Sequence, residues 1–178
     1  KNISLRRINS YTEFGKNVLS YIKRRKKPDL IMVSVPSLAV ADYISRYANE
    51  NSIPLIVDIQ DLWPEAFKMA INIPIISDII FAPMMQQANR IYSRADVIMA
   101  VSDTYVARGK SVNPVADTLS IYIGTDSNLV EEKTKGIEVS KEEGVFLIGY
   151  VGALGYSYDI KGVIDAIKLL KKEGNGDN

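Results

Sequence analysis

Hydrophobic positions along the chain fall into two alternating patterns. Short apolar runs predict a strand buried on both faces at residues 30–33, a second buried strand at 54–59, another strand at 95–101 and a short one at 119–123. A less regular alternation predicts a strand at 3–8. Helical spacing predicts helices at residues 11–26, 37–49, 75–93 and 102–110, with another opening near Pro64. Strands that alternate with helices form right-handed crossovers, so we predict an α/β protein with a Rossmann-like, doubly wound parallel sheet.

The pattern changes after Asp126. Residues 127–144 are rich in Glu and Lys and poor in apolar residues, which is typical of a surface linker. Beyond it the pattern predicts one strand at 145–151 and one helix at 160–172, and about 35 residues cannot bury a core of their own. We therefore predict a first domain over residues 1–126, a linker over 127–144, and the first βα unit of a second Rossmann-like domain over 145–178.

Composition excludes several kinds of chemistry. The chain has no Cys, which excludes disulfides and a thiolate nucleophile and agrees with a cytoplasmic protein. It also has no His, which excludes the commonest general base, the Ser-His-Asp arrangement and most zinc sites. No apolar run reaches the roughly 18 residues that a transmembrane helix needs.

A run of five basic residues, 23–27, makes one end of the chain positive. Such a run suits an anionic lipid surface or nucleic acid, but it is also typical of the solvated last turn of a helix, where cations favour the helix dipole. No aromatic residues are interleaved with it, which argues against a nucleic-acid partner.

A glycine-rich segment lies between the predicted strand 145–151 and the helix that follows it. Gly149, Gly152 and Gly155 are spaced as G-x-x-G-x-x-G, and glycines before a helix let a phosphate approach the unpaired N–H groups there. The spacing is neither the G-x-G-x-x-G of dinucleotide folds nor a P-loop, which weakens a nicotinamide interpretation. The alternative is that these glycines serve only a tight strand-to-helix turn.

A second segment, residues 58–65, follows the predicted strand 54–59 at its carboxyl end, where open α/β sheets bind ligands. Its carboxylates could accept a proton from a hydroxyl or hold a sugar, with Trp63 as a stacking face. Alternatively, Asp61 caps a helix and Trp63 belongs to the core. A third segment, residues 122–126, ends a strand with a glycine and an acid, which is usually only a turn.

Five segments carry motifs in a distinctive order: KPDLIMVS at 27–34, PLIVDIQDLWPE at 54–65, SRADVIMAVS at 93–102, IYIGTD at 121–126, and IGYVGALGYSYDIKG at 148–162. Together they resemble the family 4 retaining glycosyltransferases of the GT-B architecture, in which two Rossmann-like domains face each other across a cleft. The order matters because loop motifs at independent positions rarely agree by chance.

The resemblance implies transfer of a hexosyl or N-acetylhexosaminyl group from a nucleotide-diphosphate sugar to a hydroxyl, with retention and without a metal or cofactor. It implies that Gly152 and Gly155 bring backbone N–H groups to the diphosphate and that Lys161 pairs with its charge. Gln60 stands where many members have a His that contacts the sugar. It cannot act as a base, so Asp58 or Asp61 is the expected charged participant.

The resemblance also implies what the chain lacks. The family's first strand and acceptor loop should precede Lys1, and the paired glutamates that grip the donor should follow Asn178, so this piece is expected to be inactive. Ala153 stands where the family often has a phosphate-binding Arg. Most of the chain would be the acceptor-side domain of an enzyme of bacterial surface polysaccharide or lipid-linked glycan synthesis. Such an enzyme would be cytoplasmic, with peripheral contact to the anionic inner membrane and no nucleic-acid partner.

Two alternatives remain at this point. A Rossmann-like sheet also suits an NAD(P)- or flavin-dependent oxidoreductase, against which the missing G-x-G-x-x-G counts. It equally suits a non-enzymatic ligand-binding module, for which the absence of His and Cys is neutral.

Overall fold

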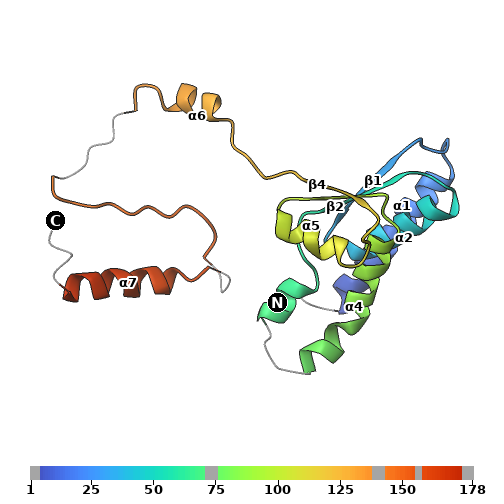
Figure 1. The fold of residues 1–178 in the computed structure, drawn as a ribbon, viewed down its shortest axis with the longest axis horizontal. Helices are drawn as coiled ribbons and strands as arrows, with labels where there is room; N and C mark the ends of the chain where they lie inside the picture. The colour runs from blue at the N-terminus through green and yellow to red at the C-terminus, as the bar shows by residue number, and fades with distance from the viewer. Residues whose placement is uncertain (1–4, 71–75, 138–142, 155–157, 174–178) are drawn as a thin grey trace. The chain divides into compact units, whose positions relative to one another are not determined.

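The structure of the chain is a computed structural model that describes residues 5–70, 76–137, 143–154 and 158–173 (Figure 1). The chain divides into unit 1, Lys1–Gly124, and unit 2, Thr125–Asn178. Unit 1 contains α1 (Leu5–Lys23), β1 (Ile31–Val35), α2 (Leu38–Glu50), β2 (Leu55–Ile59), α3 (Glu65–Ala70), α4 (Ile76–Ser93), β3 (Val97–Ala100), α5 (Asp103–Lys110) and β4 (Asp117–Ser120). Unit 2 contains α6 (Ser127–Thr134) and α7 (Ile160–Lys172).

The described strands form one four-stranded sheet in the order β1-β2-β3-β4, and all neighbouring strands are parallel. The predicted α/β class and parallel sheet are therefore confirmed. The fourth strand begins two residues earlier than predicted, at Asp117, because its register places Asp117 opposite Val97 and Ser120 opposite Ala100.

Within unit 1, the described helices cover only one face of this sheet. Val33, Val57 and Ile98 share a register row on that face and belong to the buried core. On the opposite face Met32 is 53% exposed. The prediction that the strand at 30–33 is buried on both faces is therefore wrong. The doubly wound arrangement is not seen among the described residues either, because strands that follow one another in chain order place successive right-handed crossovers on the same face.

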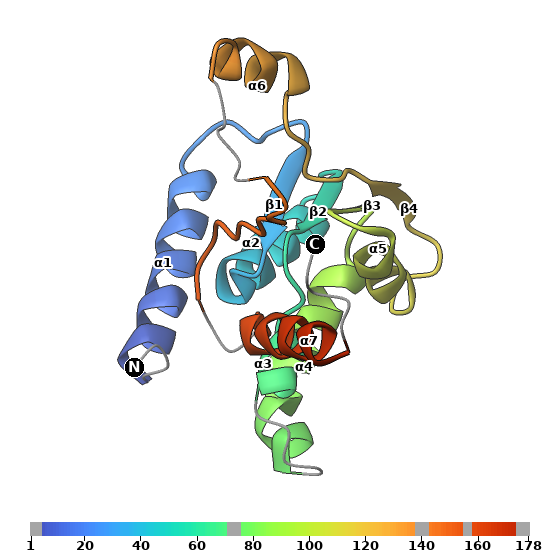
Figure 2. The same ribbon diagram turned by 90° about the vertical axis from the view of Figure 1, so that its left-hand side faces the viewer.

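The N-terminal segment is helical where a strand was predicted. α1 begins at Leu5, so the predicted strand at 3–8 is wrong for its described part, since the helical spacing of the following residues extends back to Leu5. Helices α1 and α2 lie side by side (Figure 2). Gly15 permits this close approach, because a Cβ there would stand 2.8 Å from Cδ2 of Tyr43 and 3.2 Å from the carbonyl oxygen of Ala39.

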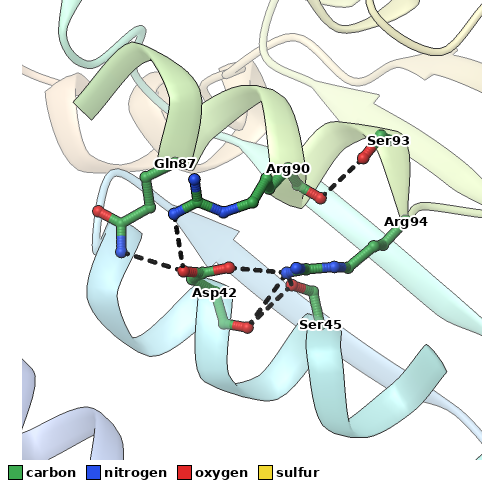
Figure 3. A network of polar contacts seen from close by, with 6 residues as sticks. All are labelled: Asp42, Ser45, Gln87, Arg90, Ser93 and Arg94. Carbon is green, nitrogen blue, oxygen red and sulfur yellow. Dashed lines mark hydrogen bonds and ion pairs between the residues drawn. The ribbon is translucent and has the colours of Figure 1, made fainter. Parts of the chain in front are cut away.

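A buried carboxylate joins α2 to α4 and to the residue that follows it (Figure 3). Asp42 accepts a hydrogen bond of 2.7 Å from Arg94 at Oδ1, while Arg90 and Gln87 each donate to Oδ2 at 3.4 Å. Arg94 also donates to the hydroxyl of Ser45, 3.1 Å away. The network thus ties two helices together with a buried charge that is fully paired.

Unit 2 has little regular structure besides its two helices. α7 is confirmed over Ile160–Lys172, and α6 occupies part of the predicted linker, where Asp126 caps it by accepting from the N–H groups of Asn128 and Leu129. Residues 145–151 form no strand, contrary to the prediction. A strand requires a neighbour for its N–H and C=O groups, and the described part of unit 2 provides none.

Candidate functional site

The candidate site lies at the carboxyl ends of the strands in unit 1. Strand β2 is flanked by β1 and β3, so its last residues emerge at the middle of this edge of the sheet. The predicted site residues Asp58, Gln60 and Asp61 all lie here. Parallel sheets bind ligands at this edge, which makes it the appropriate place to look for chemistry.

Asp58 is the centre of a small polar cluster. The residue is only 4% exposed, and its Oδ2 accepts hydrogen bonds from Ser34 Oγ at 2.9 Å and from Gln60 Nε2 at 2.6 Å. Ser34 is the register partner of Asp58 on β1. Sequence reasoning missed Ser34, although a serine within an apolar run that ends at the ligand edge is a usable signal. The cluster fixes the Gln60 amide and leaves its carbonyl oxygen available to a ligand.

Asp61 organises the loop that follows β2. Its Oδ1 accepts from the backbone N–H of Leu62 at 2.9 Å, and its Oδ2 accepts from the indole N–H of Trp63 at 3.1 Å. Asp61 therefore does not cap α3. Trp63 is partly buried and packs against the core, with its ring 4.7 Å from that of Phe67, and the Trp63-Pro64 peptide bond is cis. The carboxylate of Asp61 thus orients the Trp63 ring.

Glu65 extends this loop toward two neighbouring helices. Its Oε1 accepts a charged hydrogen bond from Arg108 Nε on α5. The guanidinium of Arg108 also donates to Asn89 Oδ1 at 2.7 Å and to Met85 Sδ at 3.0 Å, both on α4. Arg108 escaped the sequence analysis, because nothing in the spacing links a basic residue of α5 to an acidic residue 43 positions earlier.

Tyr92 lies beneath Arg108. The guanidinium carbon of Arg108 stands 5.3 Å from the Tyr92 ring centroid. Burial raises the pKa of Tyr92 to about 12, with the positive charge of Arg108 opposing the rise and the negative charges of Glu65 and Asp61 adding to it. Among the described residues, the Tyr92 hydroxyl and Glu65 Oε2 are buried without a hydrogen-bond partner. The phenol is therefore a buried, neutral group next to Arg108.

A second polar cluster lies further along the same edge, at the end of β4. Asp103, in the first turn of α5, accepts at Oδ1 from Ser120 Oγ and at Oδ2 from the Tyr122 hydroxyl at 2.6 Å. These hydrogen bonds, that of Ser120 first, lower the pKa of Asp103, and the bond to Asp103 raises the pKa of Tyr122. The segment that was interpreted as a simple turn is thus bonded to α5 through Tyr122.

The predicted diphosphate residues lie in unit 2. Gly152 is exposed, and a Cβ there would stand 2.7 Å from the Tyr150 hydroxyl, while Gly155 lies outside the described residues. Lys161 is in the first turn of α7 and pairs with Asp165. The helix N-terminus already has an anionic partner, because Asp159 accepts from the N–H of Gly162 at 2.9 Å. A phosphate at this position would have to displace the Asp159 carboxylate.

Several motif residues that carry the family resemblance have structural partners. Lys27 donates to the carbonyl oxygen of Asn51 at 2.5 Å, beyond the last turn of α2. Asp96 accepts from the backbone N–H of Leu55 at 2.8 Å and so secures the start of β2. Arg94 holds Asp42, as described above. These residues therefore stabilise the sheet and its helices. Lys27 precedes β1, and Arg94 and Asp96 precede β3, so they lie toward the amino ends of the strands, opposite the ligand edge.

The described ranges contain no group of three or more His, Cys, Asp or Glu residues that could hold a metal ion. Within the same ranges, no helix is both long and apolar enough to cross a membrane.

The arrangement at β2 suits the binding of a polyhydroxylated ligand. A buried carboxylate fixes an amide, and a second carboxylate orients an indole ring, so hydrogen-bonding and stacking groups lie within a few residues of each other. Both carboxylates already accept hydrogen bonds within the protein. Comparison with known proteins gave no match to a family model, to a curated protein or to a solved structure.

Proposed function

We propose that the chain is part of a retaining glycosyltransferase that moves a sugar from a nucleotide-diphosphate sugar to a hydroxyl acceptor. The observation that carries this proposal is the gathering of Asp58, Gln60 and Asp61 at the carboxyl end of a central parallel strand, within the segment that most closely resembles the family. The alternating α/β order of unit 1 is compatible with the Rossmann-like domains of that architecture.

In this proposal unit 1 binds the acceptor and unit 2 contributes to the donor site. The carbonyl of Gln60 accepts a hydrogen bond from a sugar hydroxyl, Asp58 holds Gln60 in place, and Trp63 offers a stacking face. The acceptor oxygen bonds to the anomeric carbon as the bond to the diphosphate breaks, and the proton of the acceptor hydroxyl passes to the departing diphosphate oxygen. Lys161 stabilises the negative charge of the departing diphosphate.

Lys161 provides the first test. Its ion pair with Asp165 is exposed and therefore worth little, so a diphosphate can compete for it. We expect uridine or guanosine diphosphate to give saturation-transfer NMR signals with the full chain, and the signal to weaken from diphosphate to monophosphate to nucleoside. Lys161→Ala should reduce the diphosphate signal several-fold, since one charge-assisted contact is lost.

Lys168→Ala is the matched control, because Lys168 lies on the same helix and pairs with the same Asp165 at 3.4 Å. Its signal should equal that of the unaltered chain. Binding of NAD with no response to either nucleoside diphosphate would overturn the proposal in favour of an oxidoreductase. No binding of any nucleotide would overturn the donor-site role proposed for Lys161.

The same proposal includes peripheral contact with an anionic membrane on the cytoplasmic side. Phe14 and Tyr21 are seven positions apart on α1, and they are 57% and 60% exposed. Arg25 lies two residues after the end of α1, and its guanidinium carbon is 4.7 Å from the Tyr21 ring centroid. Aromatic rings beside basic groups are typical of helices that lie at a membrane surface.

Liposome flotation tests this contact. The full chain should float with vesicles that contain phosphatidylglycerol and remain behind with neutral phosphatidylcholine vesicles. Arg24→Glu with Arg25→Glu should weaken binding at least about tenfold, since each basic residue near the surface contributes about 1 kcal/mol. The control pair, Arg46→Glu with Lys110→Glu, has the same net charge change at exposed positions outside the basic run 23–27. Equal binding to neutral vesicles would reject the contact.

A further inference from the structure

Unit 1 continues past the end of its sheet to Gly124. The last described backbone hydrogen bond of β4 runs from the N–H of Ile121 to the carbonyl oxygen of Ala100, at 2.8 Å. Between residues 122 and 125, the described backbone makes no further hydrogen bond to another backbone group. What holds this segment must therefore come from side chains.

One carboxylate supplies that support. Asp103 binds the hydroxyl of Ser120, the last residue of β4, and the hydroxyl of Tyr122, two residues further on. Side chains two positions apart in extended backbone point to the same side, so Ser120 and Tyr122 both face α5. Both hydrogen bonds are exposed to solvent, and they join the end of β4 and the segment after it to the same carboxylate.

Asp103 is itself well anchored. It occupies the first turn of α5, where a carboxylate favours the helix dipole, and the preceding Ser102 caps the helix by accepting from the N–H of Tyr105. Toward the other end of α5, Gly109 packs against the buried strands through Ile98 and Ile59. The carboxylate is therefore attached to a helix that is firmly seated on the sheet.

The residues after Tyr122 have no such support. Ile123 is 83% exposed. A Cβ placed on Gly124 would meet no atom within 4 Å, and Gly124 is also the last residue of unit 1. The supported part of the chain thus ends abruptly, one or two residues after the Tyr122 hydroxyl bond.

We propose that Asp103, Ser120 and Tyr122 form a clamp that extends unit 1 beyond β4, so that motion of the connection to unit 2 begins at Gly124. The clamp sets the length of the free connection. It requires neither the proposed reaction nor any ligand, because all three residues and their hydrogen bonds belong to unit 1.

Backbone ¹⁵N relaxation of the full chain tests the clamp. In the unaltered chain we expect order parameters near 0.85 at Ile121 and Tyr122, falling below about 0.6 at Gly124 and Thr125. Tyr122→Phe removes only the hydroxyl, and it should lower the value at Tyr122 below about 0.6 while leaving β1 to β3 unchanged. Tyr158→Phe, at an exposed tyrosine of unit 2, is the control and should change nothing in unit 1.

A distance measurement gives an independent readout. The chain has no Cys, so Lys110→Cys in α5 and Lys133→Cys in α6 would carry spin labels at only those two sites. Tyr122→Phe should broaden the distribution of distances between the labels. The proposal fails if Tyr122 is already mobile in the unaltered chain. It also fails if Tyr122→Phe leaves both the order parameters and the width of the distribution unchanged.

Discussion

Replacing Asp42 with alanine is expected to lower the free energy of unfolding of unit 1 by about 3 kcal/mol. The side chain of Asp42 is 10% exposed, and that of its main partner Arg94 is 19% exposed. Removing the carboxylate leaves a largely buried guanidinium without its counter-charge, which costs more than the pair itself contributes. Urea unfolding followed by fluorescence reports on unit 1 directly, because Trp63 is the only Trp in the chain.

Two further variants separate charge pairing from general damage. Asp29→Ala changes an exposed acidic residue and should alter the unfolding free energy by less than about 0.5 kcal/mol. Asp42→Ala combined with Arg94→Met removes both charges, so it should cost less than the sum of the two single variants. A loss below about 1 kcal/mol for Asp42→Ala would contradict the role of this network.

The same network predicts a pH dependence. Burial by itself raises the pKa of Asp42, but the hydrogen bond from Arg94, the charges of Arg90 and Arg94, and the hydrogen bond from Gln87 together lower it below 3.8. A lowered folded-state pKa means that the contribution is fully present above the unfolded-state value and is lost as the pH falls through the folded-state value. Asp42→Asn should therefore flatten the stability profile below about pH 4.

Gly109→Val is expected to destabilise unit 1 by about 3 kcal/mol, through overpacking. A Cβ at Gly109 would stand 2.8 Å from Cγ2 of Ile98 and 3.1 Å from Cδ1 of Ile59. Both isoleucines are fully buried in the central strands, so they cannot move aside without disturbing the core. The gain in helix propensity over glycine is below about 1 kcal/mol and cannot offset this cost. Thermal unfolding of the full chain, followed by Trp63 fluorescence, measures the loss.

Gly124→Val is the matched control, because a side chain at Gly124 meets open space. It should leave the unfolding transition within about 0.5 kcal/mol of the unaltered chain. Gly109→Val should destabilise the Ile98→Ala variant less than it destabilises the unaltered chain. The Ile98 methyl groups that clash with the new side chain are absent from that variant. Equal destabilisation at both glycines would mean that α5 does not pack closely against the sheet.

The parts of the fold that the sequence predicts well are those with strong local patterns. The apolar runs around Val33, Val57 and Ile98 identify three strands, and the amphipathic spacing of Ile160–Lys172 identifies α7. Predictions failed where the local pattern of residues favours one structure but the tertiary contacts that this structure needs are missing. Residues 145–151 have the composition of a strand, but strand formation depends on a partner that the described residues of unit 2 do not contain.

The position of the candidate site was predictable from the sequence, but the hydrogen bonds and ion pairs within it were not. The end of a buried strand identifies Asp58, Gln60 and Asp61 without any structure, because that edge of a parallel sheet is where ligands bind. Their contacts with Ser34 and Arg108 depend on strand register and on how α5 packs, which no spacing rule encodes. For the same reason the Asp103 cluster could not be found from the sequence.

Asp96 belongs to the segment 93–102, one of the five that resemble the glycosyltransferase family. Its carboxylate accepts a hydrogen bond from the N–H of Leu55 and so holds the start of β2. Arg94 in the same motif balances the charge of Asp42. Selection for a foldable sheet alone would be enough to retain both residues. A chain could lose catalytic activity and still keep this motif intact, so the motif by itself says nothing about activity, which has to be measured at Asp58, Gln60 and Asp61.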